Sequence, residues 1–435
     1  MLPSFVGPCG HMLTVPLGWW YWSLYKAHCG RRGEYQVLGN DEIDLHNQLW
    51  FQCAGLTAKV PSVGDKVFYF PQGHLEQVAA CLHEQLGLEI PTYDLPPRIL
   101  CKVTDVQLEV EAVTEEVFAK ITLLPDLEEP GESAVPTIPE KVSSSTFRKI
   151  LTASDTSTHG GCSVPKIPAE KTFPALDMSQ ESPSRGLVAK DLHGATWNFQ
   201  HVYRGTPKRH LLTSGWSNFL SEKRLRAGDT CIFMRGIGRD EILIGIKRAV
   251  RQQNLCTGIL WPNVQHGILS SARIALDTGT EFTVYDHPQS SAPTFLVGYD
   301  EVMESLKINY LPAMHFEMQL DIGEDDPEQI LKKFSGTITG KDDVDPDRWL
   351  HSDWRCLRVQ WDARHAAFRH LLPTRVSPWS IKLLLLAIQH QPPSVSVRQK
   401  RPMPFDPDIR NKPSSSRQDG TNSAHKIKLF GKCIG

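Results

Sequence analysis

The 435-residue sequence predicts a mainly β protein with additional helices, of the α+β class. Two segments, TWNFQHVYRG and EILIGIKRA, alternate side chains with the period of a β-strand. In the second segment this alternation places one set of residues inward: Ile242, Ile244 and Ile246. Short strands of this kind, separated by Gly, Pro and Ser turns, favour a small barrel.

The segments before this barrel predict a helix and several strands. DLHNQLWFQCAG reads as a short helix with Leu45, Leu49 and Cys53 on one face. VGDKVFYF predicts a strand that ends at Pro71, before a further helix. ILCKVTDVQLEVEA and EVFAKITLLP predict two antiparallel strands joined by residues 113–115. The acidic, proline-rich sequence that follows indicates a linker.

The segments after the barrel continue the mixed pattern. GILSSARIALDTG predicts a helix closed by Gly279. EFTVYDHP and FLVGYDEVMESLK predict strand, loop, strand and helix, and the segment from FSGTITG to LRVQWD predicts a strand, a turn and a strand. From about Gln391 the chain is rich in Pro, Ser, Lys and Arg, so we expect a disordered tail.

Several classes of protein are disfavoured by the composition. No run approaches the roughly 18 apolar residues of a membrane span. The ten cysteines are scattered without a CxxC pair, which argues against a zinc ribbon and favours buried, reduced thiols. Nucleophile-elbow, Walker A and HEXXH motifs are absent, and the aspartate-rich turn at 342–347 lacks the Gly and Glu of a calcium loop. We therefore predict no enzyme, no metal and no cofactor.

Positive charge is concentrated in one segment. Residues 144–251 hold 17 Lys and Arg against 9 Asp and Glu, an excess of 8, although the whole chain is formally −2. This asymmetry is typical of a module that binds nucleic acid. Residues 317–347 hold 10 acidic and 3 basic residues, and we expect them to face away from a polyanion.

The loop RGTPKRHLLTSGWS contains the strongest candidates for such binding. Its cations surround Pro207, which stiffens the loop: Arg204, Lys208 and Arg209. An arginine can bind the edge of guanine through two parallel hydrogen bonds. The hydroxyls of Ser214 and Ser217 can hold phosphates, and either can cap the short helix in SNFLSEKRL. The alternative is a basic loop that only contacts solvent.

Three segments resemble the B3 DNA-binding domain of plant auxin response factors. They are TASDTSTHGG, HVYRGTPKRHLLTSGWS and AGDTCIFMR. The similarity continues through LWFQCAG, KVFYFPQGHLEQ and TEEVFAKITLLP on one side, and FSGTITG, SDWRCLRVQWD and RVSPWSI on the other. It covers about Asp44 to Ile381, so the sequence is identified as a member of that family.

The resemblance implies a fold and a domain order. Residues 144–251 would form a B3-type seven-stranded open pseudobarrel, inserted in a dimerisation domain made of 41–130 and 252–322. A Tudor-like ancillary domain would follow at 323–382. An N-terminal extension at 1–40 remains unassigned, and we expect residues 383–435 to form a disordered tail.

The resemblance also implies a function. The chain would be a nuclear transcription factor that binds the major groove of double-stranded DNA at auxin response elements with a TGTC core. The matching contact residues are His159, Arg204, Pro207, Arg209, Ser214 and Ser217, and Lys208 suits a phosphate. The alternative is a protein-interaction scaffold that does not bind DNA and has a degenerate barrel.

The helix in GILSSARIA resembles the dimer contact of the family. Small residues would allow two copies, or a copy and a related factor, to approach across a two-fold axis: Gly267, Ser270, Ser271, Ala272 and Ala275. The chain departs from the family at Arg273 and Ile274, and the same helix could equally pack within its own domain. We expect the family's middle region and C-terminal interaction domain to be missing, which leaves repressor partners of that domain without support.

Overall fold

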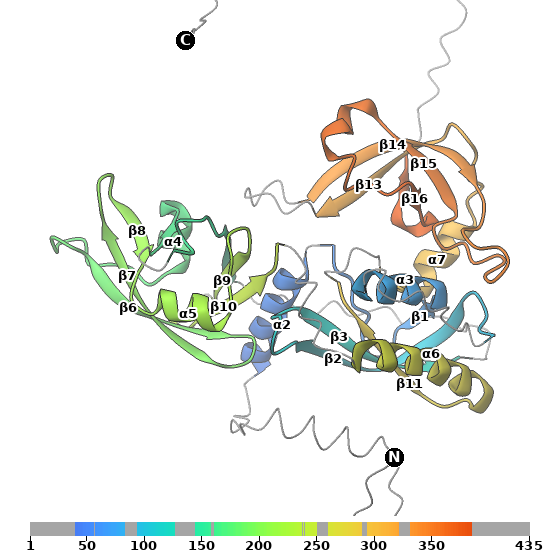
Figure 1. Cartoon of the computed structure of the whole chain (residues 1–435), viewed down its shortest axis with the longest axis horizontal. Coiled ribbons are helices and arrows are strands. Elements are labelled where there is room, and N and C mark those ends of the chain that lie inside the picture. The colour runs from blue at the N-terminus through green and yellow to red at the C-terminus, as the bar shows by residue number, and fades with distance from the viewer. Residues whose placement is uncertain are drawn as a thin grey trace, which may run out of the picture. The chain divides into compact units, whose positions relative to one another are not determined.

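The computed structural model describes most of the chain between residues 40 and 384 (Figure 1). The described ranges are 40–55, 57–82, 94–126, 144–157, 161–236, 238, 240–249, 260–288, 294–321 and 331–384. Apart from residues 40, 383 and 384, the predicted N-terminal extension (1–40) and tail (383–435) lie outside them. Leu383 belongs to a strand, so the ordered part of the chain extends into the predicted tail. In these ranges the strands form three sheets, and none of the helices is long and apolar enough to cross a membrane.

The first sheet takes strands from both sides of the barrel segment. Its order is β11-β3-β2-β1-β12, with β1 Lys66–Tyr69, β2 Ile99–Val110, β3 Val117–Pro125, β11 Phe282–Asp286 and β12 Leu296–Gly298. The helices α2 Asn40–Ala54, α3 Pro71–Leu82, α6 Leu260–Thr278 and α7 Tyr299–Leu306 accompany it. Alternate residues of β3 are buried, as the period of two requires. We call this sheet and its helices the flanking domain.

The predicted hairpin at residues 99–125 is confirmed. Strands β2 and β3 pair antiparallel from Cys101 opposite Pro125 to Val110 opposite Val117. The turn between them holds Glu115 with a φ of 64°, in the left-handed region. Leu49 and Cys53 of α2 are fully buried, which confirms the apolar face predicted for that helix.

The second sheet has seven strands and confirms the predicted open barrel. Its order is β4-β9-β10-β6-β7-β8-β5, so β4 and β5 are free edges and the barrel is not closed. The strands are β4 Ser144–Ile150, β5 Cys162–Val164, β6 Ser184–Asp191, β7 Thr196–Arg204, β8 Arg209–Leu212, β9 Thr230–Gly236 and β10 Ile242–Lys247. Strands β10 and β6 pair parallel, and the other neighbours pair antiparallel.

Aromatic and branched side chains fill the barrel. The residues predicted to point inward from β10, Ile242, Ile244 and Ile246, are at most 3% exposed. Two short helices, α4 Lys166–Thr172 and α5 Trp216–Glu222, belong to the same domain (Figure 1). Trp216 is fully buried, and its Nε1 donates a 2.8 Å hydrogen bond to the carbonyl of Asp155. Trp216 therefore stabilises the core, as expected.

The predicted cap of α5 is wrong. The N-cap is Gly215, with a φ of 84° and no side-chain cap bond, and neither Ser214 nor Ser217 takes that place. The chain turns through the left-handed region at Gly215 because it passes directly against the carbonyl of Asn198. A residue in that conformation suits glycine, whereas a serine cap needs an extended backbone.

The third sheet follows the flanking domain. Its order is β16-β15-β14-β13-β17, with β13 His315–Asp321, β14 Leu331–Lys341, β15 Leu357–Trp361, β16 Arg375–Val376 and β17 Lys382–Leu383. Two 3₁₀ turns, η1 Ala363–Phe368 and η2 Pro378–Ser380, lie between its strands. The antiparallel pairing of β14 and β15 confirms the predicted strand, turn and strand. In the aspartate-rich turn, Asp342 pairs with Arg358 at 3.0 Å.

The cysteines that the structure describes in full are free and buried: Cys53, Cys101, Cys162, Cys231 and Cys356. Burial raises the pKa of Cys53 to about 12, so its thiol stays protonated and unreactive at neutral pH. The prediction of buried thiols is confirmed for these five.

Candidate nucleic-acid interface

A β-hairpin presents the basic loop at the surface. Strands β7 and β8 pair antiparallel, and the last pair before the turn is Arg204 opposite Arg209. Every residue from Arg204 to Arg209 is exposed, including Pro207 and Lys208. The hairpin therefore brings together four predicted contact residues at one tip: Arg204, Pro207, Lys208 and Arg209.

The charges at this tip are not neutralised by ion pairs within the described part of the chain. Arg204, Lys208 and Arg209 form no ion pair with any residue that the structure describes. Cross-strand neighbours lie about 5 Å apart at Cβ, and like charges so placed repel each other. A polyanion that binds the tip would relieve this repulsion.

A buried pair of histidines supports the tip from below. Nε2 of His201 on β7 and Nδ1 of His210 on β8 are joined by a 3.0 Å hydrogen bond. Both residues are 2% exposed. Tyr203 packs on His210 at 4.7 Å between ring centroids. Burial, together with the neighbouring His210, lowers the pKa of His201 to about 4. The pair is therefore neutral at physiological pH and adds no charge to the repulsion above it.

The two predicted serines lie at the start of α5. Ser214 is exposed in the turn before the helix, and Ser217 is exposed in its first turn. The backbone of Ser214 is held in the barrel, because its carbonyl accepts a 3.0 Å hydrogen bond from the N–H of Gln200 on β7. The remaining predicted contact, His159, lies outside the described residues.

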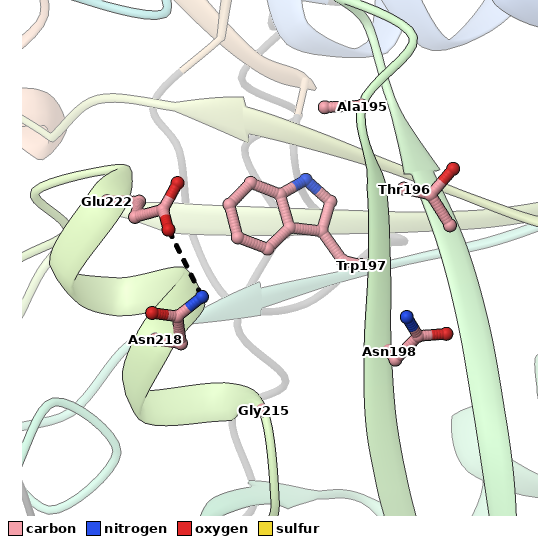
Figure 2. Close-up of a pocket in the computed structure, with 7 residues that line it drawn as sticks. All are labelled: Ala195, Thr196, Trp197, Asn198, Gly215, Asn218 and Glu222. Carbon is pink, nitrogen blue, oxygen red and sulfur yellow. Dashed lines mark hydrogen bonds between the residues drawn. The ribbon is translucent and has the colours of Figure 1, made fainter.

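An open hollow of about 340 Å³ lies between the start of β7 and α5 (Figure 2). Its lining includes Asn198, Gly215 and the Asn218–Glu222 pair, whose side chains share a 3.2 Å hydrogen bond. Figure 2 shows Trp197 pointing toward α5 and Asn198 on the other side of the strand. Within the described part of the chain, no cluster of metal-binding side chains accompanies it.

The sequence analysis missed Asn198 as a candidate contact. The alternation of β7 contains the signal, because Asn198 and Arg204 are an even number of residues apart and share the outward face. Both are exposed in the structure.

Several cations of the basic segment are already paired with carboxylates. Lys149 pairs with Asp155 at 3.0 Å, and Arg248 pairs with Asp229 at 2.9 Å. Lys223 is 8% exposed and pairs with two carboxylates. Asp155, Asp191 and Asp229 lie within residues 144–251 and are already subtracted in the excess of eight, so of these pairs only that of Lys223 with Glu115 offsets a further charge.

Comparison with known proteins places these features in a family. Residues 147–250 match the B3 DNA binding domain, and residues 295–385 match the auxin response factor ancillary domain. Auxin response factor 2A of Solanum lycopersicum is 45% identical over 414 residues, which are 91% of this chain and 47% of the relative. Auxin response factor 2 of Arabidopsis thaliana is 45% identical over 415 residues, with 93% and 47% covered.

The chain belongs to the auxin response factor family. It spans about half the length of the curated relatives it matches. Among solved structures, the chain is similar to one described as the Arabidopsis FUS3–DNA complex, with 25% identity, a TM-score of 0.22, and coverage of 24% of this chain and 97% of that one.

In this auxin response factor the predicted dimer helix has two distinct faces. Gly267 and Ser271 are exposed, and Ser270 is half-buried. Ala272 and Ala275 are at most 1% exposed and belong to the core of their own flanking domain. The prediction that these two alanines meet a partner is therefore wrong, because residues three apart on a helix share one face and that face is already covered.

The arginine of this helix is not buried without a partner. Arg273 pairs with Asp277 one turn later at 2.9 Å and donates to the carbonyl of Asp94 at 3.2 Å. Next to it, Ile274 is 58% exposed. The outward face of α6 thus combines small residues with one exposed apolar side chain.

Proposed function

We propose that the protein is a DNA-binding transcription factor of the auxin response, not an enzyme, and that it acts in the nucleus. The barrel would dock the β7–β8 hairpin in the major groove of elements with a TGTC core. The observation that carries this proposal is the exposed, unpaired Arg204 opposite Arg209 at the hairpin tip. The names of the relatives support it.

The residues have distinct roles in this proposal. The guanidinium groups of Arg204 and Arg209 are planar forks that can each bind O6 and N7 of one guanine. Lys208 is a flexible point charge and suits a phosphate. The exposed hydroxyls of Ser214 and Ser217 would donate to the sugar–phosphate backbone. His159 and Pro207 join this set through the family resemblance.

Substitution of Arg204 tests base reading. Arg204→Ala should weaken binding to a TGTC duplex by about 1–3 kcal/mol, roughly 5- to 150-fold, and should reduce the preference over a scrambled duplex. Arg358→Ala removes an exposed arginine of the third sheet and is the matched control. Fluorescence anisotropy at fixed salt measures both. An equal loss on both duplexes would show that Arg204 reads no base.

Wild-type binding separates this proposal from the alternative of a DNA-independent scaffold. A gel shift with and without the TGTC core is sufficient. If the purified chain ignores both duplexes at moderate ionic strength, the scaffold alternative takes its place.

Self-association is the second part of the proposal, and the exposed face of α6 supports it. Two copies, or this chain and a related factor, would pair through Gly267, Ser270 and Ser271 across a two-fold axis. Sedimentation at micromolar concentration tests this. Ile274→Asp should shift a dimer toward the monomer without unfolding the chain, because Ile274 is mostly exposed. A wild-type chain that sediments only as a monomer would defeat it.

A further inference from the structure

The turn between β2 and β3 of the flanking domain inserts a carboxylate into the barrel. Glu115 is 7% exposed, although it is charged and lies at the tip of a turn. Its Oε1 accepts a 2.8 Å bond from Nζ of Lys223, and its Oε2 lies 3.1 Å from Nε2 of His193. Both partners belong to the barrel, so this single side chain joins two domains.

The lysine that Glu115 contacts is held by the barrel as well. Nζ of Lys223 lies 2.7 Å from the carboxylate of Asp191 and 5.5 Å from the centroid of Trp197. Asp191 in turn accepts a 2.9 Å hydrogen bond from Nε1 of Trp197 and a 3.0 Å bond from the N–H of His193. These contacts within the barrel hold the ammonium group of Lys223 in place independently of Glu115.

A second cation holds the neighbouring residue of the same turn. Nε of Arg248 donates to the carbonyl of Thr114 at 2.9 Å. Its other nitrogens donate to Asp229 at 2.9 Å and to the carbonyl of Lys223 at 2.7 Å. Arg248 is 7% exposed. Two buried cations therefore hold the turn, and one of them, Arg248, also binds the backbone of the other, Lys223.

Buried charges of this kind specify geometry more than they add stability. Removing an ion pair from water costs several kcal/mol per ion, and the attraction offsets this cost only when the geometry is good. A tilt of the barrel that moved Lys223 away from Glu115 would leave Lys223 paired with Asp191 but would take from the carboxylate of Glu115 its lysine partner. The network therefore favours one orientation of the barrel on the flanking domain.

The apolar attachment of the barrel lies elsewhere. Leu49 and Cys53 of α2 pack directly against Gly245 of β10. The guanidinium of Arg148 on β4 donates to the carbonyl of Gln52 at 3.0 Å. This contact holds the barrel on α2 even when the turn is released. The loss of Glu115 should thus loosen the angle of the barrel without detaching it.

We propose that Glu115 is a positioning residue that locks the DNA-binding barrel in one orientation on the flanking domain. Lys223 directly follows α5, whose first turn carries Ser217, so the lock acts one short helix away from the proposed DNA face. In a dimer, which rests on the proposed function, the lock would hold the two hairpins at a fixed separation. Glu115 would then narrow the range of half-site spacings that the protein accepts.

The lock can be measured without DNA. Spin labels on non-natural amino acids at positions 63 and 188, which carry valines that are 62% and 53% exposed, report the distance between flanking domain and barrel. Wild type should give a narrow distance distribution, and Glu115→Gln one at least about twofold wider. Glu301→Gln breaks an exposed 2.6 Å ion pair to Lys59 within the flanking domain and should leave the width unchanged. An unchanged width in Glu115→Gln overturns the proposal.

A milder variant guards against loss of the fold. His193→Ala removes one partner of Glu115 at a site that is 25% exposed and keeps the Lys223 pair. It should give a distribution between those of wild type and Glu115→Gln. If His193→Ala gives a distribution as narrow as that of wild type, His193 does not contribute to the lock. If Glu115→Gln does not fold, the same narrow distribution for His193→Ala overturns the proposal.

DNA binding provides the functional readout. Glu115→Gln should keep its affinity for a single TGTC site within about twofold and should lose most of the preference among paired sites of different spacing. A spacing profile identical to wild type, with a broadened distance distribution, would overturn the functional part. If wild type binds no DNA, the proposed function fails, but the distance measurement still decides whether Glu115 locks the barrel.

Discussion

Acidification should weaken the hairpin that presents Arg204 and Arg209. The reason is the hydrogen-bonded, buried pair His201–His210. In the antiparallel register His210 lies opposite Tyr203, in the pair next to Arg204–Arg209, and His201 lies two residues further along β7, opposite Leu212. Burial lowers the pKa of both rings, and the neighbouring His210 lowers that of His201 further. Around His210, the neighbouring Glu170 raises its pKa and Lys166 lowers it. Protonation of the pair would place positive charge in the barrel core.

The magnitude follows from the depressed pKa of His201. That pKa is about 4 in the folded chain and 6.5 in an unconstrained histidine. Between these two values the unfolded chain binds protons more readily than the folded chain. The stability from a neutral His201 is therefore complete above pH 6.5 and decreases as the pH falls toward 4, where the loss reaches about 3 kcal/mol.

Hydrogen exchange of β7 and β8 measures this loss. The exchange of their amides, corrected for the intrinsic pH dependence, gives the free energy of opening between pH 7.5 and pH 4.5. His201→Phe should flatten the pH profile, at the expense of an unpaired nitrogen on His210. His370→Gln, which removes an exposed histidine of the third sheet, should leave the profile unchanged. Equal slopes for wild type and His201→Phe would refute the assignment to this pair.

Three further substitutions test the interface and its support. Lys208→Ala should weaken TGTC and scrambled duplexes alike and reduce the slope of log K against log salt by about one, and an unchanged slope would exclude a phosphate contact. Gly215→Ala should lower the free energy of unfolding of the barrel, measured in urea, by about 1–3 kcal/mol. Gly215 has a φ of 84°, and an added Cβ would collide with the carbonyl of Asn198. Gly186→Ala, at a site with open space around it, should leave the free energy of unfolding unchanged. Gly245→Ala should lower the free energy of unfolding by about 1–3 kcal/mol, because the added Cβ would overlap the side chain of Cys53. Adding Cys53→Ala to the same chain should restore part of that free energy. If it restores none, α2 does not press on this glycine.

Local periodicity predicted most of the elements of the fold. The inward isoleucines of β10 and the β2–β3 hairpin depend only on neighbours along the strand, so the sequence pattern is sufficient. The cap of α5 was not predictable in this way. It depends on a left-handed backbone at Gly215 and on the carbonyl of Asn198, distant in the sequence, which leaves no room for a side chain there. The number of strands in the barrel came from family resemblance. Their order was not predicted, because nonlocal pairing such as that of β10 with β6 leaves no local signal.

The hairpin tip of the candidate site was predictable, but its surroundings were not. Arg204 and Arg209 stand out in the sequence as charges around a proline turn. The charge count could not reveal that Lys223 and Arg248 are buried, since their partners include Glu115, which lies 108 positions before Lys223. Helix α6 was misread for a related reason. Small residues occupy both its faces, and only packing shows that Ala272 points inward.

The way in which the barrel is inserted has a consequence for how such proteins diversify. The sheet of the flanking domain pairs all of its strands without using any strand of the barrel. Both ends of the inserted segment meet the same host: Ser144 donates to the side chain of Gln48 at 3.1 Å, and Arg248 to the backbone of Thr114. We therefore expect that a different barrel that retains these end contacts could replace the segment while the flanking sheet stays intact.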